Sequence, residues 1–165
     1  MKKLLLSILL LLLITTSACS SNNDNAKEKA NVDPSNNTES EETIVYESEN
    51  GPIEVPANPE RIIVLSTYAG DVLKLGGNIV GADSWSMDNP NFSEGLAYAE
   101  EVSDESLEKI IELNPDLIIG LSTIKNIDKL NEIAPTVTFT YGKVDYLQQH
   151  IEIGKLLNKE KEATE

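Results

Sequence analysis

Short runs of isoleucine, leucine and valine, alternating with helical segments, constrain the fold of this chain more than any other feature. Each run has the length of one buried strand, and the runs lie at residues 61–65, 78–82, 116–120 and 136–140. The segments between and after them have helical apolar spacing or helix-ending residues, over 68–75, 106–113, 126–133 and 144–157. This alternation predicts an α/β fold in which helices cover both faces of a parallel sheet.

A strand pair is predicted ahead of the alternating part, over residues 43–47 and 52–55, because Asn50-Gly51 is a typical hairpin turn. Residues 84–104 show no periodicity and are expected to form an irregular surface segment. The helix that follows this segment is expected to turn its apolar side chains to the core: Leu107, Ile110, Ile111 and Leu113.

Residues 1–18 have the layout of an export signal. Lys2 and Lys3 precede an apolar run over residues 4–14, which is far shorter than the roughly 20 residues of a membrane-spanning helix. Small residues then lead to Cys19, the only cysteine, and this junction resembles the bacterial lipobox. The resemblance implies cleavage before Cys19 and attachment of a lipid to its thiol. The alternative is an ordinary cleaved signal that happens to contain a cysteine.

Residues 19–42 are rich in Asn, Ser, Glu and Lys and hold almost no large apolar side chain. Such a segment cannot bury enough apolar surface to offset its ordering entropy, so it is expected to be a disordered tether. As a flexible coil it would span roughly 25 Å. The whole chain has a net charge of -15, and such an acidic protein repels phosphate backbones, so nucleic-acid binding is unexpected.

Four sequence blocks resemble those of class III substrate-binding proteins, the iron–siderophore and cobalamin receptors of ABC importers. The blocks occur in the family's order, at residues 58–62, 106–120, 133–137 and 153–163. Residues 66–70 and the region around Tyr141 are most similar to hydroxamate-siderophore receptors of Gram-positive bacteria.

The resemblance implies that residues 43–158 form the N-terminal lobe of a class III periplasmic-binding-protein fold. Members of the family have two lobes joined by a long rigid helix, with the ligand between the lobes. Residues 159–165 are therefore expected to begin that helix, and the second lobe is missing from the sequence. The alternative from a different functional class is a truncated surface lipoprotein that binds no ligand.

In an open α/β sheet, ligands bind beyond the carboxyl ends of the strands. The residues that follow the four predicted strands are therefore the ligand-binding candidates: Thr67, Tyr68, Trp85, Ser122, Thr123 and Tyr141. Aromatic faces with hydroxyl neighbours suit a large chelate that offers oxygens and methylene arms. Aromatic residues at strand ends can also simply cap the core, and Tyr68 can instead begin a helix.

Charge favours one class of chelate over another. Anionic catecholate or citrate chelates call for clusters of Arg or Lys, but the strand-end loops offer only Lys125 and Lys143. Arg61, at the start of a strand, is expected to serve the structure. A neutral or cationic ferric hydroxamate is therefore preferred, with haem, cobalamin or a catecholate siderophore as alternatives within the family. No cofactor or metal site is expected, because His150 is the only histidine and the ligand carries its own Fe(III).

Docking to the permease forms a second expected site. The resemblance implies that Glu108 pairs with arginines of the membrane subunits, and the alternative is an ordinary solvated glutamate. No phosphate-binding loop or nucleophile elbow occurs, so an enzyme is not expected. Together these features predict a monomeric receptor, lipid-anchored outside the membrane of a Gram-positive bacterium, that delivers a ferric siderophore to an ABC importer.

Overall fold

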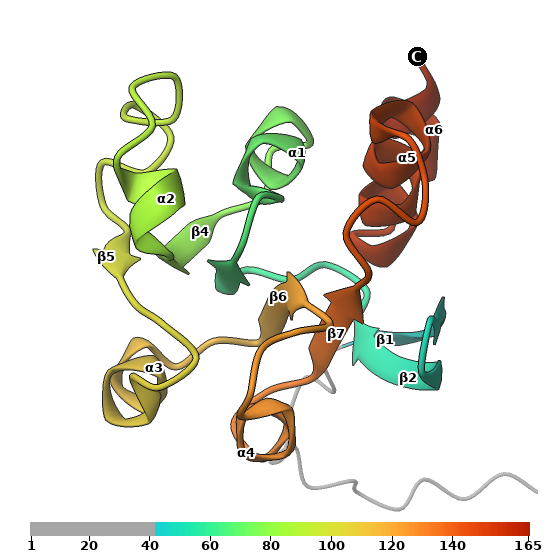
Figure 1. Ribbon diagram of the computed structural model, residues 1–165. Helices are drawn as coiled ribbons and strands as arrows, with labels where there is room; N and C mark the ends of the chain where they lie inside the picture. Colours follow the sequence, from blue (N-terminus) through green and yellow to red (C-terminus); the bar gives the residue numbers. More distant parts are fainter. Residues whose placement is uncertain (1–41) are drawn as a thin grey trace, which may run out of the picture. The chain divides into compact units, whose positions relative to one another are not determined.

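The computed structural model describes residues 42–165, and its centre is a five-stranded parallel sheet (Figure 1). The strand order is β5-β4-β3-β6-β7, and every pairing in the sheet is parallel. The strands are β3 (Ile62–Leu65), β4 (Ile79–Ala82), β5 (Glu100–Glu101), β6 (Leu117–Leu121) and β7 (Thr136–Phe139). The predicted parallel α/β fold is confirmed. Cys19, the signal and the tether up to residue 41 lie outside the described residues.

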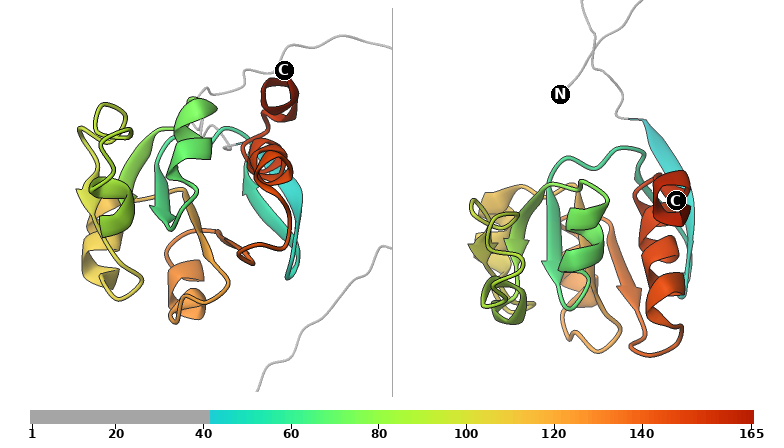
Figure 2. Two further views of the ribbon diagram at one scale, coloured as in Figure 1. Left: turned by 45° about the horizontal axis from the view of Figure 1, so that its top comes forward. Right: turned by 90° about the horizontal axis from the view of Figure 1, so that it is seen from above.

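Helices cover both faces of this sheet (Figures 1 and 2). One face carries α1 (Ala69–Lys74), α5 (Tyr146–Leu156) and α6 (Glu160–Thr164), and the other carries α3 (Leu107–Leu113) and α4 (Ile127–Asn131). Successive side chains of a strand point to opposite faces, so each strand supplies both cores. In β3, Ile62 and Val64 join the core under α1 and α5, while Ile63 and Leu65 join the core under α3 and α4. Within residues 42–165 no helix is long and apolar enough to span a bilayer.

A two-stranded hairpin of β1 (Thr43–Ser48) and β2 (Gly51–Pro56) lies beside β7, as the turn signal predicted (Figure 1). Its tip is bound to β7 and to the residue after it: Asn50 Nδ2 donates to Thr138 Oγ1 at 3.1 Å, and the Thr140 amide donates to Glu49 Oε1 at 3.2 Å. Gly51 has φ +106°, a conformation that favours glycine. The hairpin thus extends the sheet layer without joining its ladder.

The segment over 84–104, expected to be irregular, contains two short elements. Asp83 caps α2 (Ser84–Met87) by accepting a hydrogen bond from the Ser86 amide at 3.2 Å. Farther along, β5 adds an edge strand of two residues to β4. Both elements are too short to produce a periodic pattern, which is why the prediction missed them.

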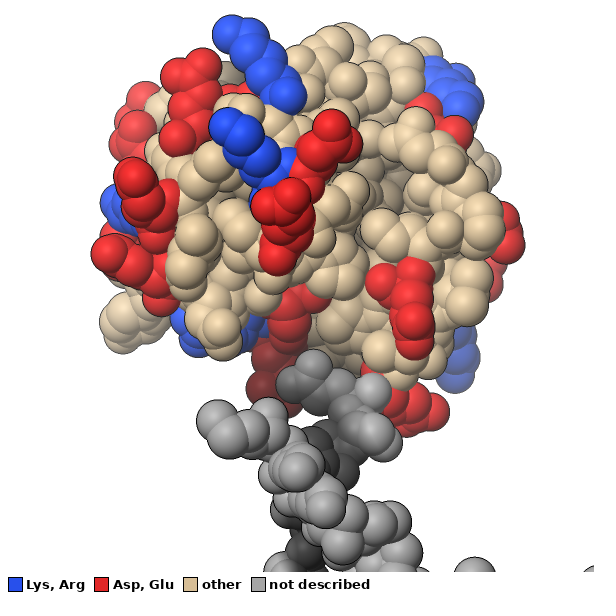
Figure 3. All heavy atoms as spheres, turned by 90° about the horizontal axis from the view of Figure 1, so that it is seen from below, with Lys and Arg blue, Asp and Glu red and all other residues tan. Residues whose placement is uncertain are grey.

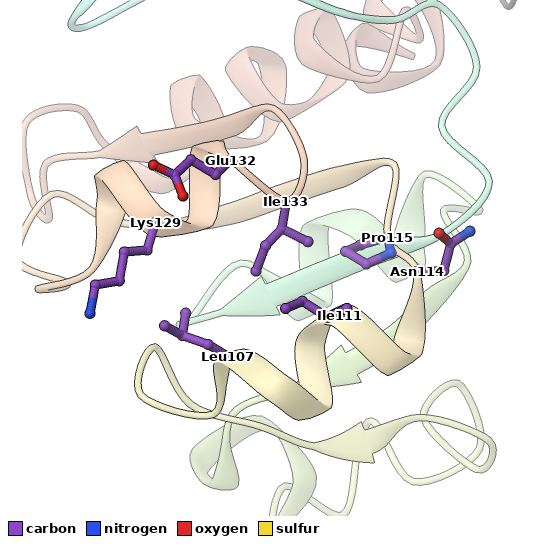
Figure 4. Close-up of a pocket in the computed structure, with 7 residues that line it drawn as sticks. All are labelled: Leu107, Ile111, Asn114, Pro115, Lys129, Glu132 and Ile133. Carbon is purple, nitrogen blue, oxygen red and sulfur yellow. The ribbon is translucent and has the colours of Figure 1, made fainter.

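The prediction that Ile111 faces the core is wrong. Its neighbour Ile110 is fully buried, and Ile111, about 100° farther around the helix, is 58% exposed. Ile111 instead lines a groove between α3 and α4 together with Leu107 and Ile133 (Figure 4).

At the end of the chain, α6 packs against α5. A side chain at Gly154 would collide with Ala163, so the close approach of the two helices depends on this glycine. The residues expected to begin the inter-lobe helix are thus helical over α6.

Candidate ligand-binding edge

The ligand candidates lie along the carboxyl edge of the sheet, because every strand of the sheet runs in the same direction. We call five of them the edge row, and in strand order they are Trp85, Thr67, Ser122, Thr123 and Tyr141. They follow four adjacent strands, β4, β3, β6 and β7, so the row is about 15 Å long at the usual strand spacing.

The centre of the edge row is the point where the chain reverses direction across the sheet. From β3 the chain moves outward to β4 and β5, then crosses back to β6 and β7. The loops after β3 and β6 therefore diverge, and ligands of open α/β sheets bind at such a switch point. Thr67 and Ser122 lie on its two sides, Thr67 half-buried and Ser122 exposed.

The two aromatic residues of the edge row are open to solvent. Trp85, in α2, is 53% exposed and makes an edge contact with Phe92 at a centroid distance of 6.4 Å. Tyr141, after β7, is 75% exposed. Aromatic side chains that cap a core are mostly buried, whereas large apolar faces of Trp85 and Tyr141 remain accessible to solvent. Their exposure therefore does not fit the alternative that they cap the core.

Hydrogen bonds tie the loops of the edge row together. The Ser122 amide donates to the Phe139 carbonyl at 2.9 Å, and Thr140 Oγ1 donates to Ser122 Oγ at 3.3 Å. On the other side of the switch point, Ser86 Oγ donates to the Ser66 carbonyl at 3.3 Å. The loops that present the candidates are therefore held by the strands beneath them.

Tyr68 is set apart from the edge row. It is 1% exposed, stands just before α1, and packs its ring against Phe139 at 5.3 Å. Burial, together with the nearby charges of Glu49 and Asp71, raises the pKa of Tyr68 to about 12. Its side chain lines a cavity between the hairpin, the end of β7 and α5, and its hydroxyl lies 3.5 Å from the Phe139 carbonyl.

Both lysines near the edge row have acidic partners. Lys143 Nζ lies 3.2 Å from Glu49 Oε2, and Lys125 Nζ lies 3.8 Å from Glu105 Oε1. Burial works to raise the pKa of Glu49, but hydrogen bonds from Thr140 and Lys143 outweigh it, so this pKa is lowered. Because both lysines have acidic partners, the edge row lacks the cationic cluster that an anionic chelate needs.

On the α3–α4 face, acidic side chains are spread with basic ones between them (Figure 3).

Glu108 lies in the first turn of α3 and is exposed. The end of α3 leads into the start of β6, at the amino edge of the sheet. The first turn of α3 therefore lies toward the carboxyl edge. In the described part of the chain, no ion pair of Glu108 is found. Its neighbour Lys109 pairs with Glu100 at 3.0 Å.

A polar contact that the sequence did not predict joins α1 to α5. Asp71 accepts from Gln149 Nε2 at 2.9 Å, and its other oxygen lies 2.9 Å from His150 Nδ1. The partners are 78 and 79 residues apart, so no local pattern could pair them. His150 thus contacts a single carboxylate, and no group of three metal-binding side chains occurs within 42–165.

Comparisons with known proteins agree with this architecture. A family model described as Periplasmic binding protein matches residues 62–165. The chain is 43% identical over 106 residues to the iron(3+)-hydroxamate-binding protein YxeB of Bacillus subtilis, covering 64% of this chain and 32% of that protein. It is 40% identical over 125 residues to the iron(3+)-hydroxamate-binding protein FhuD of the same organism, covering 74% and 40%.

Unliganded FhuD2 from Staphylococcus aureus superposes with a TM-score of 0.70 at 36% identity, covering 74% of this chain and 46% of that structure. The chain therefore spans less than half the length of these relatives. The family model, in contrast, covers more than half of the chain. The chain belongs to the periplasmic binding protein family.

Proposed function

We propose that the edge row forms one wall of a binding site for a ferric hydroxamate siderophore. The observation that carries this proposal is the combination of exposed aromatic and hydroxyl side chains at the switch point with lysines that are already paired. A neutral or cationic chelate needs no cationic cluster, and its methylene arms can pack on Trp85 and Tyr141. The names of the two Bacillus relatives, both iron-hydroxamate-binding proteins, support the same ligand class.

Binding of this kind involves no chemical step. The iron stays inside its chelate, and the hydroxyl groups of Thr67, Ser122 and Thr123 donate hydrogen bonds to chelate oxygens. The relatives are more than twice as long as the matched region, which supports our proposal that a second lobe forms the opposite wall of the site. The edge row alone is expected to bind more weakly than the two walls together.

Fluorescence of Trp85, the only tryptophan, offers the test of ligand binding. The full chain, and the full chain completed with the second lobe of YxeB, are titrated with ferrioxamine B. We expect saturable quenching in the completed chain and weaker quenching in the full chain, because the chelate stacks on Trp85. A catecholate or citrate chelate of Fe(III) should quench much less. Absence of saturable quenching by ferrioxamine B in the completed chain would contradict the ligand assignment.

The proposal extends to membrane attachment and delivery. The lipid on Cys19 would keep the receptor at the outer face of the membrane, and Glu108 would pair with arginines of an importer permease. The exposure of Glu108 and its lack of a partner among the residues described support this role.

Uptake of radioactive iron by cells that carry the completed chain tests the docking step. Glu108→Ala should lower uptake while leaving the affinity for ferrioxamine B unchanged. Glu112→Ala is the matched control, because Glu112 is also exposed on α3 but lies one turn farther along. Equal uptake by both variants would remove Glu108 from the docking role.

A further inference from the structure

The two strands of the hairpin differ in what their outer edges offer to a further strand. In an antiparallel pair, residues that exchange hydrogen bonds with the other strand alternate with residues whose N–H and C=O groups point away from it. The Ala57 amide donates to the Glu42 carbonyl at 2.7 Å, one pair beyond the ladder of β1 and β2. Counted along the register from this pair, Thr43, Val45 and Glu47 direct their N–H and C=O groups away from β2. We call these three residues the open edge of β1.

The outer edge of β2 is closed to strand addition. Its outward positions are Pro52, Glu54 and Pro56, the residues paired with the open edge of β1. Because proline has no N–H group, only Glu54 could donate a hydrogen bond to an added strand. Prolines on an edge strand are a usual protection against pairing with other chains. The hairpin carries this protection on β2 and lacks it on β1.

The open edge is unpaired and accessible. Within residues 42–165, its N–H and C=O groups form no hydrogen bond. The side chains of all three residues are exposed, and that of Val45 is 67% exposed. In both views of Figure 2 the hairpin lies at one margin of the described chain, beside α5. An extended strand from outside this part of the chain can therefore pair with β1.

The open edge is complementary to a second copy of itself. A twofold axis at Val45 places this residue opposite Val45 of the second copy, and Thr43 opposite Glu47. Two branched apolar side chains then face each other, and no like charges do. Centring the pair on Glu47 would instead bring two carboxylates together, which is destabilising. Charge thus selects the register centred on Val45 and favours a second copy as the occupant.

We infer that two copies of this chain associate through the open edge, so that their hairpins form one antiparallel sheet in the order β2-β1-β1-β2. Each opposed pair of open-edge residues exchanges backbone hydrogen bonds, and the two Val45 side chains cover each other. This interface lies on the hairpin, away from the edge row and from Glu108 on α3. It therefore goes beyond the proposed function, and it replaces the monomer expected from the sequence.

Two features set the strength of this association. A single strand pair buries less than the roughly 1,200 Å² of a standard interface, so we expect a Kd of about 0.1–1 mM. The chain has a net charge of -15, so two copies repel each other. Raising the ionic strength from about 0.01 M to about 0.15 M shortens the Debye length from about 30 Å to about 8 Å and should tighten the association.

Sedimentation equilibrium of the full chain, without any iron chelate, tests the association over a concentration series that reaches about 1 mM. We expect the apparent mass to rise from that of one chain toward that of two. Amide hydrogen exchange over the same series locates the contact. The amides of Thr43, Val45 and Glu47 should exchange more slowly at the highest concentration, whereas the amide of Glu54 on β2 should not change.

A pair of variants tests the backbone contact. Val45→Pro removes an N–H group that points away from β2, so the hairpin ladder keeps its hydrogen bonds, and the variant should associate at least tenfold more weakly. Val45→Thr is the matched control, because it keeps the N–H group and a branched side chain. Its Kd should stay within about threefold of that of the unaltered chain. Circular dichroism confirms that each variant is folded.

A charge pair tests whether Val45 faces its own copy. Val45→Glu and Val45→Lys should each associate more weakly than the unaltered chain, because each places like charges opposite each other. A mixture of the two should associate at least fivefold more tightly than either variant alone. The same two substitutions at Tyr98, which is 99% exposed and outside the hairpin, should show no such gain on mixing.

Three results would overturn the inference. The first is the mass of a single chain at every concentration. The second is equal association of Val45→Pro and the unaltered chain, and the third is a mixture no tighter than its components. If Val45→Pro does not fold, the mixture decides alone. Because no iron is present, failure here leaves the proposed siderophore site untouched, and the reverse also holds.

Discussion

At the amino edge of the sheet, polar side chains are bound to the backbone of neighbouring loops, whereas at the carboxyl edge the side chains of Trp85, Thr123 and Tyr141 are exposed. Arg61 donates to the Leu113 carbonyl through Nε at 3.0 Å and Nη2 at 2.6 Å, and Nε also lies 3.0 Å from the Asn114 carbonyl. Asp116 accepts from the amides of Glu60, at 2.6 Å, and Arg61, at 2.9 Å. The structural role expected for Arg61 is thus confirmed.

This difference assigns separate tasks to the two edges. At the amino edge, the hydrogen bonds close the loops before β3 and β6, so substitutions there should change the free energy of unfolding. At the carboxyl edge, Trp85 and Tyr141 contribute little to the core because more than half of each side chain is exposed. Substitutions there should change ligand affinity while the stability stays constant.

Arg61→Ala should have the largest effect on stability. The substitution removes the donor to two carbonyls, and hydrogen bonds from charged groups contribute about 1.5–3 kcal/mol each when measured by deletion, so we expect a loss of about 2 kcal/mol. Urea denaturation of the full chain measures this loss. Lys129→Ala, an exposed cation on α4, serves as the control with a change below about 0.5 kcal/mol. An equally small change in Arg61→Ala would contradict the division between the edges.

Tyr141→Ala should weaken binding of ferrioxamine B to the completed chain about tenfold, which corresponds to about 1.4 kcal/mol. Its effect on the free energy of unfolding should stay below about 0.5 kcal/mol, because Tyr141 is 75% exposed. Tyr98→Ala is the matched control, since Tyr98 is 99% exposed but stands before β5, away from the edge row. Equal affinities of the two variants would show that Tyr141 does not contact the chelate.

The free energy of unfolding should fall as the pH rises from about 10 through about 12. In the folded chain the phenol of Tyr68 has a pKa of about 12, whereas in the unfolded chain the same phenol ionises near pH 10. The stabilisation from this neutral phenol is present below pH 10 and is lost as the pH passes the folded pKa. Urea denaturation at a series of pH values measures the decline.

Tyr68→Phe should reduce that decline, because Phe has no proton to lose. At neutral pH the same substitution should change the stability by less than about 0.5 kcal/mol, since the hydroxyl makes only a 3.5 Å contact. This is the smallest effect among the predictions, and a loss above 1 kcal/mol at neutral pH would indicate a stronger hydrogen bond. An unchanged slope above pH 10 would show that other groups cause the decline.

The sequence predicted those parts of the fold that depend on local patterns. The apolar runs located β3, β4, β6 and β7, and Asn50-Gly51 located the hairpin turn, because strand burial and turn geometry depend on adjacent residues. The exposure of Ile111 was not predicted, since α3 is so short that one position decides which side chains face the core.

The sequence predicted less of the candidate site. It located residues after strand ends, and a parallel sheet must bring those residues to one edge. Whether Tyr68 turns inward depends on Phe139, which is 71 residues away, so no local pattern could predict it. The same limit applies to the contact of Asp71 with His150 and to the cavity between the hairpin, β7 and α5, which forms only when these elements pack together.

Nuclear magnetic resonance with a paramagnetic ligand tests most directly whether the carboxyl edge is the ligand surface. Ferrioxamine B is added to the isotope-labelled full chain, and its gallium analogue provides the diamagnetic reference. We predict that Fe(III) broadens the resonances of Thr67, the Trp85 indole, Ser122 and Tyr141, while those of Arg61 and its neighbours stay sharp. Broadening at the amino edge, or uniform broadening over the whole chain, would contradict the assignment of ligand binding to the edge row.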